Sequence, residues 1–303
     1  MAVLNQAKLE VIRQAELQMA RDDGDRYREE LGKVIMEMDD AYRKQGNPFR
    51  SHLGASLLGR KCSRELWYSF RWFTRTKHSP RLMRLFNRGH LEEARFIAFL
   101  RQVEGVQVVC AHPETGKQFR ISFANGHGGG SLDSLIYNLP DLPGEWVLGE
   151  YKTHNEKSFK KLVKEGVQKA KPEHYTQMQI YGAKYGLNWA LYLAVCKNDD
   201  AIHGELVRVQ PHVMDQYIVR GEKIIATDTP PPRISANPTW YECKFCDQHG
   251  VCHDGHEPAM NCRTCIHSSP IENKEWWCHK HSIYIKEDLM ITGCATWDPN
   301  WKD

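Results

Sequence analysis

The feature that most constrains this chain is the placement of its ten cysteines, seven of which lie beyond residue 240. That segment follows Thr229-Pro230-Pro231-Pro232 and contains histidines, aromatic residues and turn formers, but too few aliphatic residues for a core of its own. The N-terminus has no uninterrupted apolar segment typical of a secretory signal, so we expect reduced thiols. Reduced thiols at short spacings favour metal sites over disulfides.

The first set of cysteines combines a CxxC pair with more distant thiols. Cys243 and Cys246 are followed six residues later by Cys252, and Cys62 is the candidate for the fourth ligand. Four thiolates suit a [4Fe-4S] cluster or a tetrahedral Zn²⁺ ion. The spacing alone does not choose between the two metals.

The second set lies in the last 50 residues of the chain and is complete in itself. We predict a structural zinc site with four thiol ligands, for one of which His267, His279 or His281 could substitute. The predicted ligands are Cys262, Cys265, Cys278 and Cys294. The two remaining cysteines, Cys110 and Cys196, lie in apolar strand-like runs and are interpreted as small core residues.

The rest of the chain alternates between helical and strand-like patterns. Residues 1 to about 45 predict one or two amphipathic helices, broken near Asp22-Asp23-Gly24 and ended by Gly46-Asn47-Pro48. Further along, the patterns predict a helix from Pro80 to Gly105, four short strands within 106–153, helices at 157–170 and 173–186, two strands within 189–209, and a helix to about Ile225. This order is typical of an α/β domain.

Positive charge is concentrated locally, although the net charge is only +3. Between Arg60 and Arg88, nine basic residues stand against the single acid Glu65 and are interleaved with aromatic residues. This composition is typical of a nucleic-acid surface, but a solvated helix face above core aromatics would look the same. The predicted DNA contacts are Arg60, Arg64, Arg71 and Trp72, together with Lys160 and Lys161 from a second basic run.

Two acidic residues and a lysine occupy strand-like runs in the middle of the chain. Asp133 lies in GGSLDSLIYN, and Glu150 in WVLGEYKTH is followed two residues later by Lys152. Side-chain alternation places Glu150 and Lys152 on one strand face, and paired strands could bring Asp133 to the same point. Two carboxylates there would bind Mg²⁺ or Mn²⁺, and the lysine would position or help to deprotonate a water molecule. Acids and lysines also recur on any solvated strand, so the pattern alone is weak.

The order of several short motifs resembles the RecB-like branch of the PD-(D/E)xK nucleases. The motifs are Gly89-His90, the GxxD that ends at Asp133, the ExK of Glu150 and Lys152, and the QxxxY of Gln177 and Tyr181. The resemblance implies that His90, Asp133, Glu150 and the backbone carbonyl of Tyr151 hold one or two Mg²⁺ or Mn²⁺ ions. It also implies catalytic roles for Lys152, Gln177 and Tyr181.

Cys62 with Cys243, Cys246 and Cys252 resembles the iron–sulfur site of AddB-type and CRISPR-associated members of this family. The second cysteine set resembles zinc-ribbon-like tails of phage-encoded nucleases. The resemblance implies an α/β, restriction-endonuclease-like core: a helix, a mixed central sheet and flanking helices. We expect an N-terminal helical segment at 1–49, a nuclease domain with an iron–sulfur staple at 50–253, and a zinc-ribbon-like tail at 254–303.

The function implied by the resemblance is a metal-dependent DNA exonuclease that hydrolyses phosphodiester bonds from DNA ends, in recombination or phage genome processing. Two other hypotheses remain open. The chain could be a CRISPR-associated spacer-acquisition nuclease, or a catalytically silent DNA-binding module. The expected partners are linear DNA and a single-strand annealing protein or helicase. We expect a cytoplasmic protein, in a bacterial host if phage-encoded, because the N-terminus does not resemble a secretory signal. We expect no membrane partner, because no apolar run approaches the ~20 residues needed to span a bilayer.

Overall fold

The computed structural model describes residues 9–37, 50–75 and 79–301, and its chain divides into two compact units. Unit 1 is assembled from Met1–Lys44, His78–Ile121 and Ser131–Met214. Unit 2 is assembled from Gln45–Lys77, Ser122–Gly130 and Asp215–Asp303. Each unit therefore combines segments that are far apart in the sequence. The domain boundaries expected at residues 49 and 253 stay a prediction.

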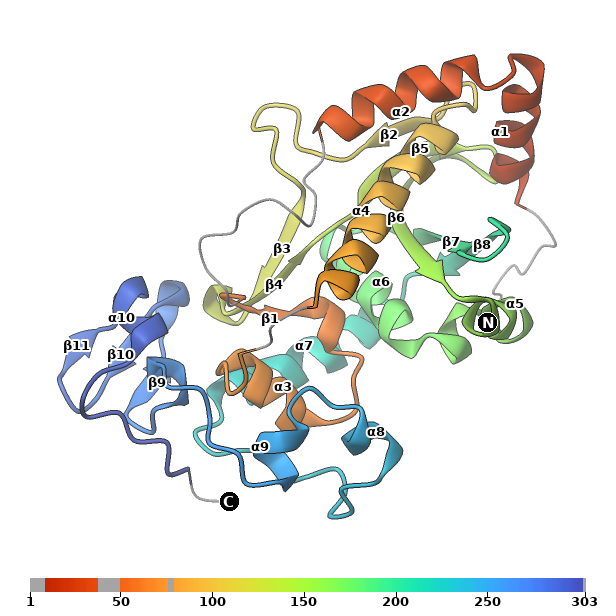
Figure 1. Cartoon of the computed structure of the whole chain (residues 1–303). Helices are drawn as coiled ribbons and strands as arrows, with labels where there is room; N and C mark the ends of the chain where they lie inside the picture. The colour runs from red at the N-terminus through yellow and green to blue at the C-terminus, as the bar shows by residue number, and fades with distance from the viewer. Residues whose placement is uncertain (1–8, 38–49, 76–78, 302–303) are drawn as a thin grey trace. The chain divides into compact units, whose positions relative to one another are not determined.

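Unit 1 is built on a five-stranded mixed sheet in the order β2-β5-β6-β7-β8 (Figure 1). Only β6 and β7 run parallel, while each other neighbouring pair is antiparallel. The strands are β2 (Gln107–Val109), β5 (Ser134–Leu139), β6 (Leu142–His154), β7 (Trp189–Cys196) and β8 (Ile202–Arg208). A parallel pair needs a long crossover, and the chain between β6 and β7 supplies it as two helices.

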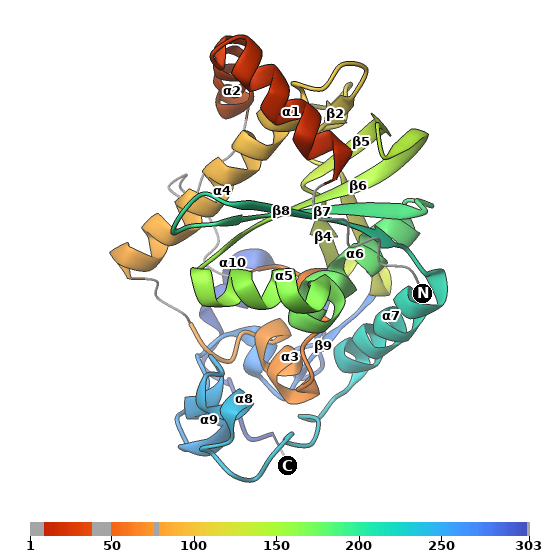
Figure 2. The same cartoon turned by 90° about the vertical axis from the view of Figure 1, so that its right-hand side faces the viewer.

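Helices cover both faces of this sheet (Figure 2). On one face α4 (Pro80–Leu100) packs against β6, and α1 (Glu10–Arg21) and α2 (Asp25–Glu37) pack against α4. On the other face lie the crossover helices α5 (Glu156–Ala170) and α6 (Pro172–Lys184). The predicted fold class, a helix followed by a mixed central sheet with flanking helices, is confirmed.

Local sequence signals account for the helix boundaries. The Ser79 side chain caps α4 by accepting a hydrogen bond from the Leu82 amide (3.2 Å), and Pro80 occupies the first turn. The predicted break between the N-terminal helices is confirmed at Asp22, whose carboxylate accepts a hydrogen bond from the amide of Gly24 at φ +77°. The stop predicted at Gly46-Asn47-Pro48 lies outside the described residues. In the described part of the chain, no helix is both long and apolar enough to cross a membrane.

The remaining elements lie wholly or partly in unit 2. A small sheet has the order β1-β4-β3, and a second, near the C-terminus, has the order β11-β10-β9. The strands are β1 (Leu53–Gly54), β3 (Arg120–Phe123), β4 (Gly128–Ser131), β9 (Ser268–Pro270), β10 (Trp276–Cys278) and β11 (Ile283–Tyr284). The helices are α3 (Ser63–Phe70), α7 (Pro211–Ala226), α8 (Tyr241–Lys244), α9 (His249–His253) and α10 (Glu287–Thr292), with 3₁₀ turns η1 (Ala55–Leu57), η2 (Ala124–Gly126), η3 (Cys262–Thr264) and η4 (Glu272–Lys274).

Candidate active site and candidate metal centres

Asp133 lies at the bend between β4 and β5, one residue before the strand in which the sequence pattern had placed it. The register of β5 and β6 pairs Ser134 with Gly149, so one further antiparallel step sets Asp133 opposite Glu150. Its Oδ2 accepts a hydrogen bond from the Tyr151 backbone amide at 3.0 Å. This bond fixes the carboxylate beside β6.

Glu150 and Lys152 project from the same face of β6, as alternation predicts. The Lys152 ammonium group forms an ion pair with Glu150 Oε1 and lies 3.7 Å from Asp133 Oδ2. Glu150 is fully buried, whereas a quarter of the Lys152 side chain is exposed. The three side chains of the predicted motif are therefore in contact, with the lysine on the open side.

The QxxxY helix, α6, lies against β6. Gln177 Nε2 donates a hydrogen bond of 2.9 Å to Glu150 Oε2, so each Glu150 oxygen is engaged by a different residue. Tyr181, one turn further along α6, is buried. Gln177 thus fixes the orientation of the Glu150 carboxylate through this hydrogen bond.

Glu93 joins this cluster although the motifs did not single it out. With Gly89, Glu92 and Lys152 it lines a polar pocket of about 330 Å³, which is within the range of about 300–1,000 Å³ for small-molecule sites. Burial and the neighbouring Asp133 carboxylate raise the pKa of Glu93 to about 8. The available signal was its helical spacing, because Glu93 is one turn beyond His90 in α4.

The other two charged groups of the cluster also have shifted pKa values. The pKa of Glu150 is raised to about 8, mainly because the side chain is buried. Burial alone would lower the pKa of Lys152, but Glu150 and Asp133 outweigh that effect and raise it above its usual range. Without a bound cation, Glu93 and Glu150 are therefore mostly protonated at pH 7, and a cation bound beside them would favour their ionised forms.

Two further predicted metal ligands take different positions. The His90 side chain is exposed, while the residues of α4 that line the pocket are Gly89, Glu92 and Glu93. The Tyr151 side chain points away from Glu150, stacks on Phe96 at 5.5 Å and shares a 2.6 Å hydrogen bond with Ser134. Only the backbone of Tyr151 is therefore available to the site. The metal-binding roles of His90 and Tyr151 stay predictions.

A histidine pair that belongs to none of the sequence motifs continues the same pocket wall. His154 is the next residue after Lys152 on that face of β6, and both His154 and His174 line the pocket. Tyr192 OH lies 2.9 Å from His154 Nε2 and 2.8 Å from His174 Nδ1. Burial lowers the pKa of His154 to about 4 and that of His174 well below its usual value, so both rings are neutral at pH 7.

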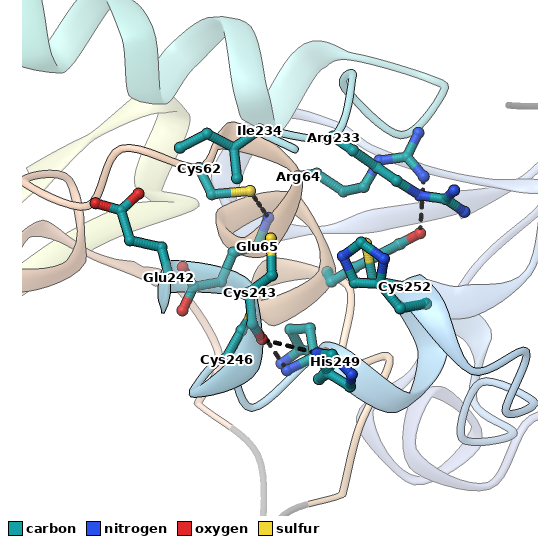
Figure 3. Close-up of a pocket in the computed structure, with 13 residues that line it drawn as sticks. Cys62, Arg64, Glu65, Arg233, Ile234, Glu242, Cys243, Cys246, His249 and Cys252 are labelled. Atoms are coloured by element: carbon teal, nitrogen blue, oxygen red, sulfur yellow. Dashed lines mark hydrogen bonds between the residues drawn. The ribbon is translucent and has the colours of Figure 1, made fainter. Parts of the chain in front are cut away.

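The first cysteine set converges on one pocket in unit 2 (Figure 3). Cys62 caps α3 through a 3.4 Å hydrogen bond from the Glu65 amide, Cys243 lies in α8, and Cys252 lies in α9. Cys246 follows α8, and its sulfur accepts a hydrogen bond from the Gln248 amide at 3.4 Å. Cys62, predicted as the fourth ligand from 181 residues away, thus lines the same pocket as the other three.

The second cysteine set lines a separate pocket in unit 2. Its residues include Cys262, Cys265, Cys278 and Cys294, together with His267. Burial and the three neighbouring thiols raise the pKa of Cys262 to about 12. In the described part of the chain, no group of three His, Cys, Asp or Glu side chains has the geometry to hold a metal ion. The convergence of four soft donors on each pocket nevertheless fits a thiophilic metal.

The basic and aromatic stretch after Arg60 is mostly interior. Arg71 is fully buried, and Trp72 and Arg64 are 3% and 4% exposed. Arg60 forms an ion pair with Glu65, and Arg64 donates a hydrogen bond to the carbonyl of Pro231. Buried side chains do not present charge or ring faces to a nucleic acid, so this placement does not support the predicted DNA contacts of Arg64, Arg71 and Trp72.

The second basic run does lie at the surface. Lys160 and Lys161 are exposed on α5. Lys160 forms an ion pair with Glu156, and the Lys161 ammonium lies 3.9 Å from Glu165. Exposed pairs of this kind are weak and are easily exchanged for phosphate contacts. The DNA-binding role of both lysines stays a prediction.

Comparison with other proteins gives a likeness in structure only. No family model matches the chain, and no curated protein matches its sequence. Among solved structures, the chain is similar to the alkaline exonuclease LHK-Exo from Laribacter hongkongensis, with 19% identity and a TM-score of 0.38 over 58% of this chain and 87% of that one. A structure of LHK-Exo in complex with dAMP gives 19% identity and a TM-score of 0.39 over the same shares. SSO0001 gives 14% identity and a TM-score of 0.41 over 75% of this chain and 93% of that one.

Proposed function

We propose that unit 1 is a divalent-metal-dependent DNA exonuclease of the PD-(D/E)xK type. The observation that carries the proposal is the contact of Asp133, Glu150 and Lys152 at the edge of one polar pocket, with Glu93 beside them. Asp133, Glu150 and Glu93 would hold one or two Mg²⁺ or Mn²⁺ ions, because hard carboxylate oxygens are the ligands these ions prefer. His90 and the carbonyl of Tyr151 are the further ligands that the family pattern suggests.

The residues of the chain have distinct tasks in this proposal. A bound ion would polarise the scissile phosphate and lower the pKa of a water molecule. The raised pKa of Lys152 keeps its ammonium protonated, which favours a role in holding the phosphate or the attacking water over a role as general base. Gln177 keeps Glu150 in place through its 2.9 Å hydrogen bond.

The proposal is tested with end-labelled linear DNA and closed circular DNA of the same sequence, in Mg²⁺ or Mn²⁺. We expect digestion of the linear form alone, and labelled products that report the polarity. Asp133→Asn should abolish digestion, whereas Glu145→Gln, which removes an exposed carboxylate from the same strand, should not. Equal cutting of circular DNA would indicate an endonuclease, and binding without digestion would indicate a silent DNA-binding module.

We also propose that the first cysteine set holds a [4Fe-4S] cluster with a structural role. The support is that Cys62, Cys243, Cys246 and Cys252 line one pocket and would close a long chain loop. Loop closure restricts the unfolded chain and is expected to stabilise the fold by a few kcal/mol. Anaerobically purified protein should be coloured and contain iron and sulfide. A colourless protein that contained zinc alone would contradict the cluster.

For the second cysteine set we propose a structural Zn²⁺ ion. Cys262, Cys265, Cys278 and Cys294 would be its ligands, since all four line one small pocket in a segment with few aliphatic residues. Metal analysis of the purified chain should find zinc, and its removal by strong chelators should lower the melting temperature.

A further inference from the structure

Two arginine side chains are buried side by side in unit 2 in the same aromatic core. Arg71 is fully buried and Arg263 is 3% exposed. The Arg71 guanidinium lies over the rings of Trp67, Trp276 and Trp301, with centroid distances of 4.9, 5.4 and 4.5 Å. Arg263 lies over Trp72 at 3.8 Å, Trp276 at 4.7 Å and Phe70 at 5.4 Å. Trp276 therefore contacts both cations.

Within the described residues, neither guanidinium has a carboxylate as an ion-pair partner. Arg263 donates hydrogen bonds to the carbonyls of Phe70 (3.1 Å) and Ser51 (2.8 Å). The Nε and Nη2 atoms of Arg71 are buried without a hydrogen-bond partner, and the exposed Asp228 acts on its charge only through space. Buried charges are normally paired or bound to an ion, so two adjacent buried cations require a source of negative charge.

The second cysteine set is one such source, and its backbone contacts Arg71. Arg71 Nη1 donates hydrogen bonds of 3.2 Å to the carbonyls of Arg263 and Ser268. Arg263 is one of the two residues between Cys262 and Cys265, and the Ser268 hydroxyl donates to the carbonyls of both of these cysteines. A negative charge on Cys265 would also stabilise the Arg71 cation. Arg71 thus contacts the backbone of the CxxC turn itself.

We propose that Cys262, Cys265, Cys278 and Cys294 bind Zn²⁺ as an all-thiolate site, and that Arg71 and Arg263 are its internal counter-ions. The inference rests on the zinc ion proposed for this set. Binding replaces four S–H bonds with four Zn–S bonds and releases four protons. The product carries two net negative charges, which the two guanidinium groups balance. Three thiolates and a neutral histidine would leave one arginine charge uncompensated.

The positions of the histidines agree with this ligand set. His279 and His281 are exposed, and their Nε2 atoms form hydrogen bonds with the hydroxyl groups of Ser269 (2.9 Å) and Thr296 (2.8 Å). His267 lines the pocket with the thiols, and His281 Nε2 lies 4.0 Å from Cys294 Sγ. The charge of the two arginines therefore favours Cys294 over His267 or His281 as the fourth ligand.

The ligand set is tested on the wild-type chain by X-ray absorption at the zinc edge. We expect a shell of four sulfur atoms. A shell of three sulfur atoms and one nitrogen would overturn the all-thiolate site and the charge match. Metal analysis that found no zinc in the purified chain would overturn this inference together with the zinc proposal, and would leave the nuclease proposal unaffected.

The counter-ion role is tested with Arg71→Met, which keeps the length and apolar volume of the side chain but removes its charge. We expect the zinc affinity, measured by chelator competition, to fall about 10- to 100-fold, as for other groups that support metal ligands. The melting temperature of the zinc-free variant should equal or exceed that of the zinc-free wild type, because an uncompensated buried cation is gone. Arg71→Lys should restore most of the affinity.

The control is Arg208→Met, which removes an arginine stacked on Trp189 at 5.0 Å in unit 1 and should leave zinc affinity unchanged. Equal loss of stability by Arg71→Met with and without zinc, at unchanged zinc affinity, would show that Arg71 serves packing alone and would overturn the inference. If the variant fails to fold even with zinc, Arg71→Lys replaces it: charge retention then predicts near-normal zinc affinity, and a loss as large as 100-fold would contradict it.

Discussion

The two units bury ionisable groups of opposite kind. In unit 1 the carboxyl groups of Glu93, Asp133 and Glu150 surround a single Lys152, whereas in unit 2 Arg71 and Arg263 lie together without a carboxylate partner among the described residues. Charge is costly in a low-dielectric interior. Without a metal ion, the pKa values of about 8 keep Glu93 and Glu150 mostly protonated at pH 7, whereas the two arginines have no carboxylate to balance them.

A metal ion would change the two sites in different ways. In unit 1 a hard divalent cation would bind among oxygen ligands at an open pocket. In unit 2 a zinc ion would convert four neutral thiols into a dianionic centre within a pocket lined by protein. We expect the two proposed metal sites to differ in this way, and four variants in unit 1 test its side of the comparison.

The largest effect is expected for Glu150→Gln, which removes a site charge but keeps the shape of the side chain. We expect the rate of DNA digestion to fall by about three orders of magnitude, since an ion would lose a ligand. The metal-free variant should be at least as stable as the wild type, because a buried carboxylate has gone. Urea unfolding with and without Mg²⁺ measures the free energy of unfolding of the variant and of the wild type. A metal-free variant that was much less stable would indicate that unit 1 has no excess of negative charge.

Lys152→Met should lower the rate about 100-fold, a typical contribution of a group that positions or exchanges protons in the transition state. Since the lysine is not a metal ligand in the proposal, Mg²⁺ or Mn²⁺ affinity should be kept or should rise when the competing cation is removed. Isothermal titration with Mn²⁺ checks this. Lys169→Met, an exposed lysine on α5, is the matched control. Loss of metal affinity in Lys152→Met would mean that its role has been misassigned.

Gln177→Ala should have a smaller effect, with digestion slowed about 10-fold. The variant loses the 2.9 Å hydrogen bond to Glu150 but keeps every charge of the site. The effect should appear in kcat at saturating Mn²⁺ and partly as weaker Mn²⁺ affinity. Unaltered kinetics would show that the QxxxY glutamine does not orient Glu150.

The last effect is on stability rather than on rate, and it concerns the pH dependence of the histidine pair. The folded-state pKa of His154 is about 4, below its unfolded value, so its stabilising contribution is present above about pH 6.5 and is lost as the pH falls towards 4. His154→Gln cannot gain this proton, and its unfolding free energy should fall less steeply over that range. Integrated over this pH range, the difference between the two unfolding free energies is at most about 3 kcal/mol. Identical slopes would mean that His154 is not buried in its neutral form.

Local sequence patterns predicted much of unit 1. The helix break at Asp22–Gly24 and the strands that contain Glu150 and Lys152 follow from turn formers and side-chain alternation, which act over a few residues. The register of β5 and β6 then brings Asp133 opposite Glu150, because a short antiparallel connection leaves little choice of pairing. The roles of these residues, and the metals at the cysteine sets, stay predictions.

The sequence by itself determined which strand face carries the acid and the lysine, since the two-residue period of a strand is a property of the backbone. Only the tertiary structure decided that Arg71 and Trp72 are interior, because the groups that cover them come from about 190 residues further along the chain. It also brought Glu93 to the site, since the position of a helix beside a sheet depends on packing across the whole core. Composition describes what a segment contains, and the partners that fold onto it determine whether it faces water.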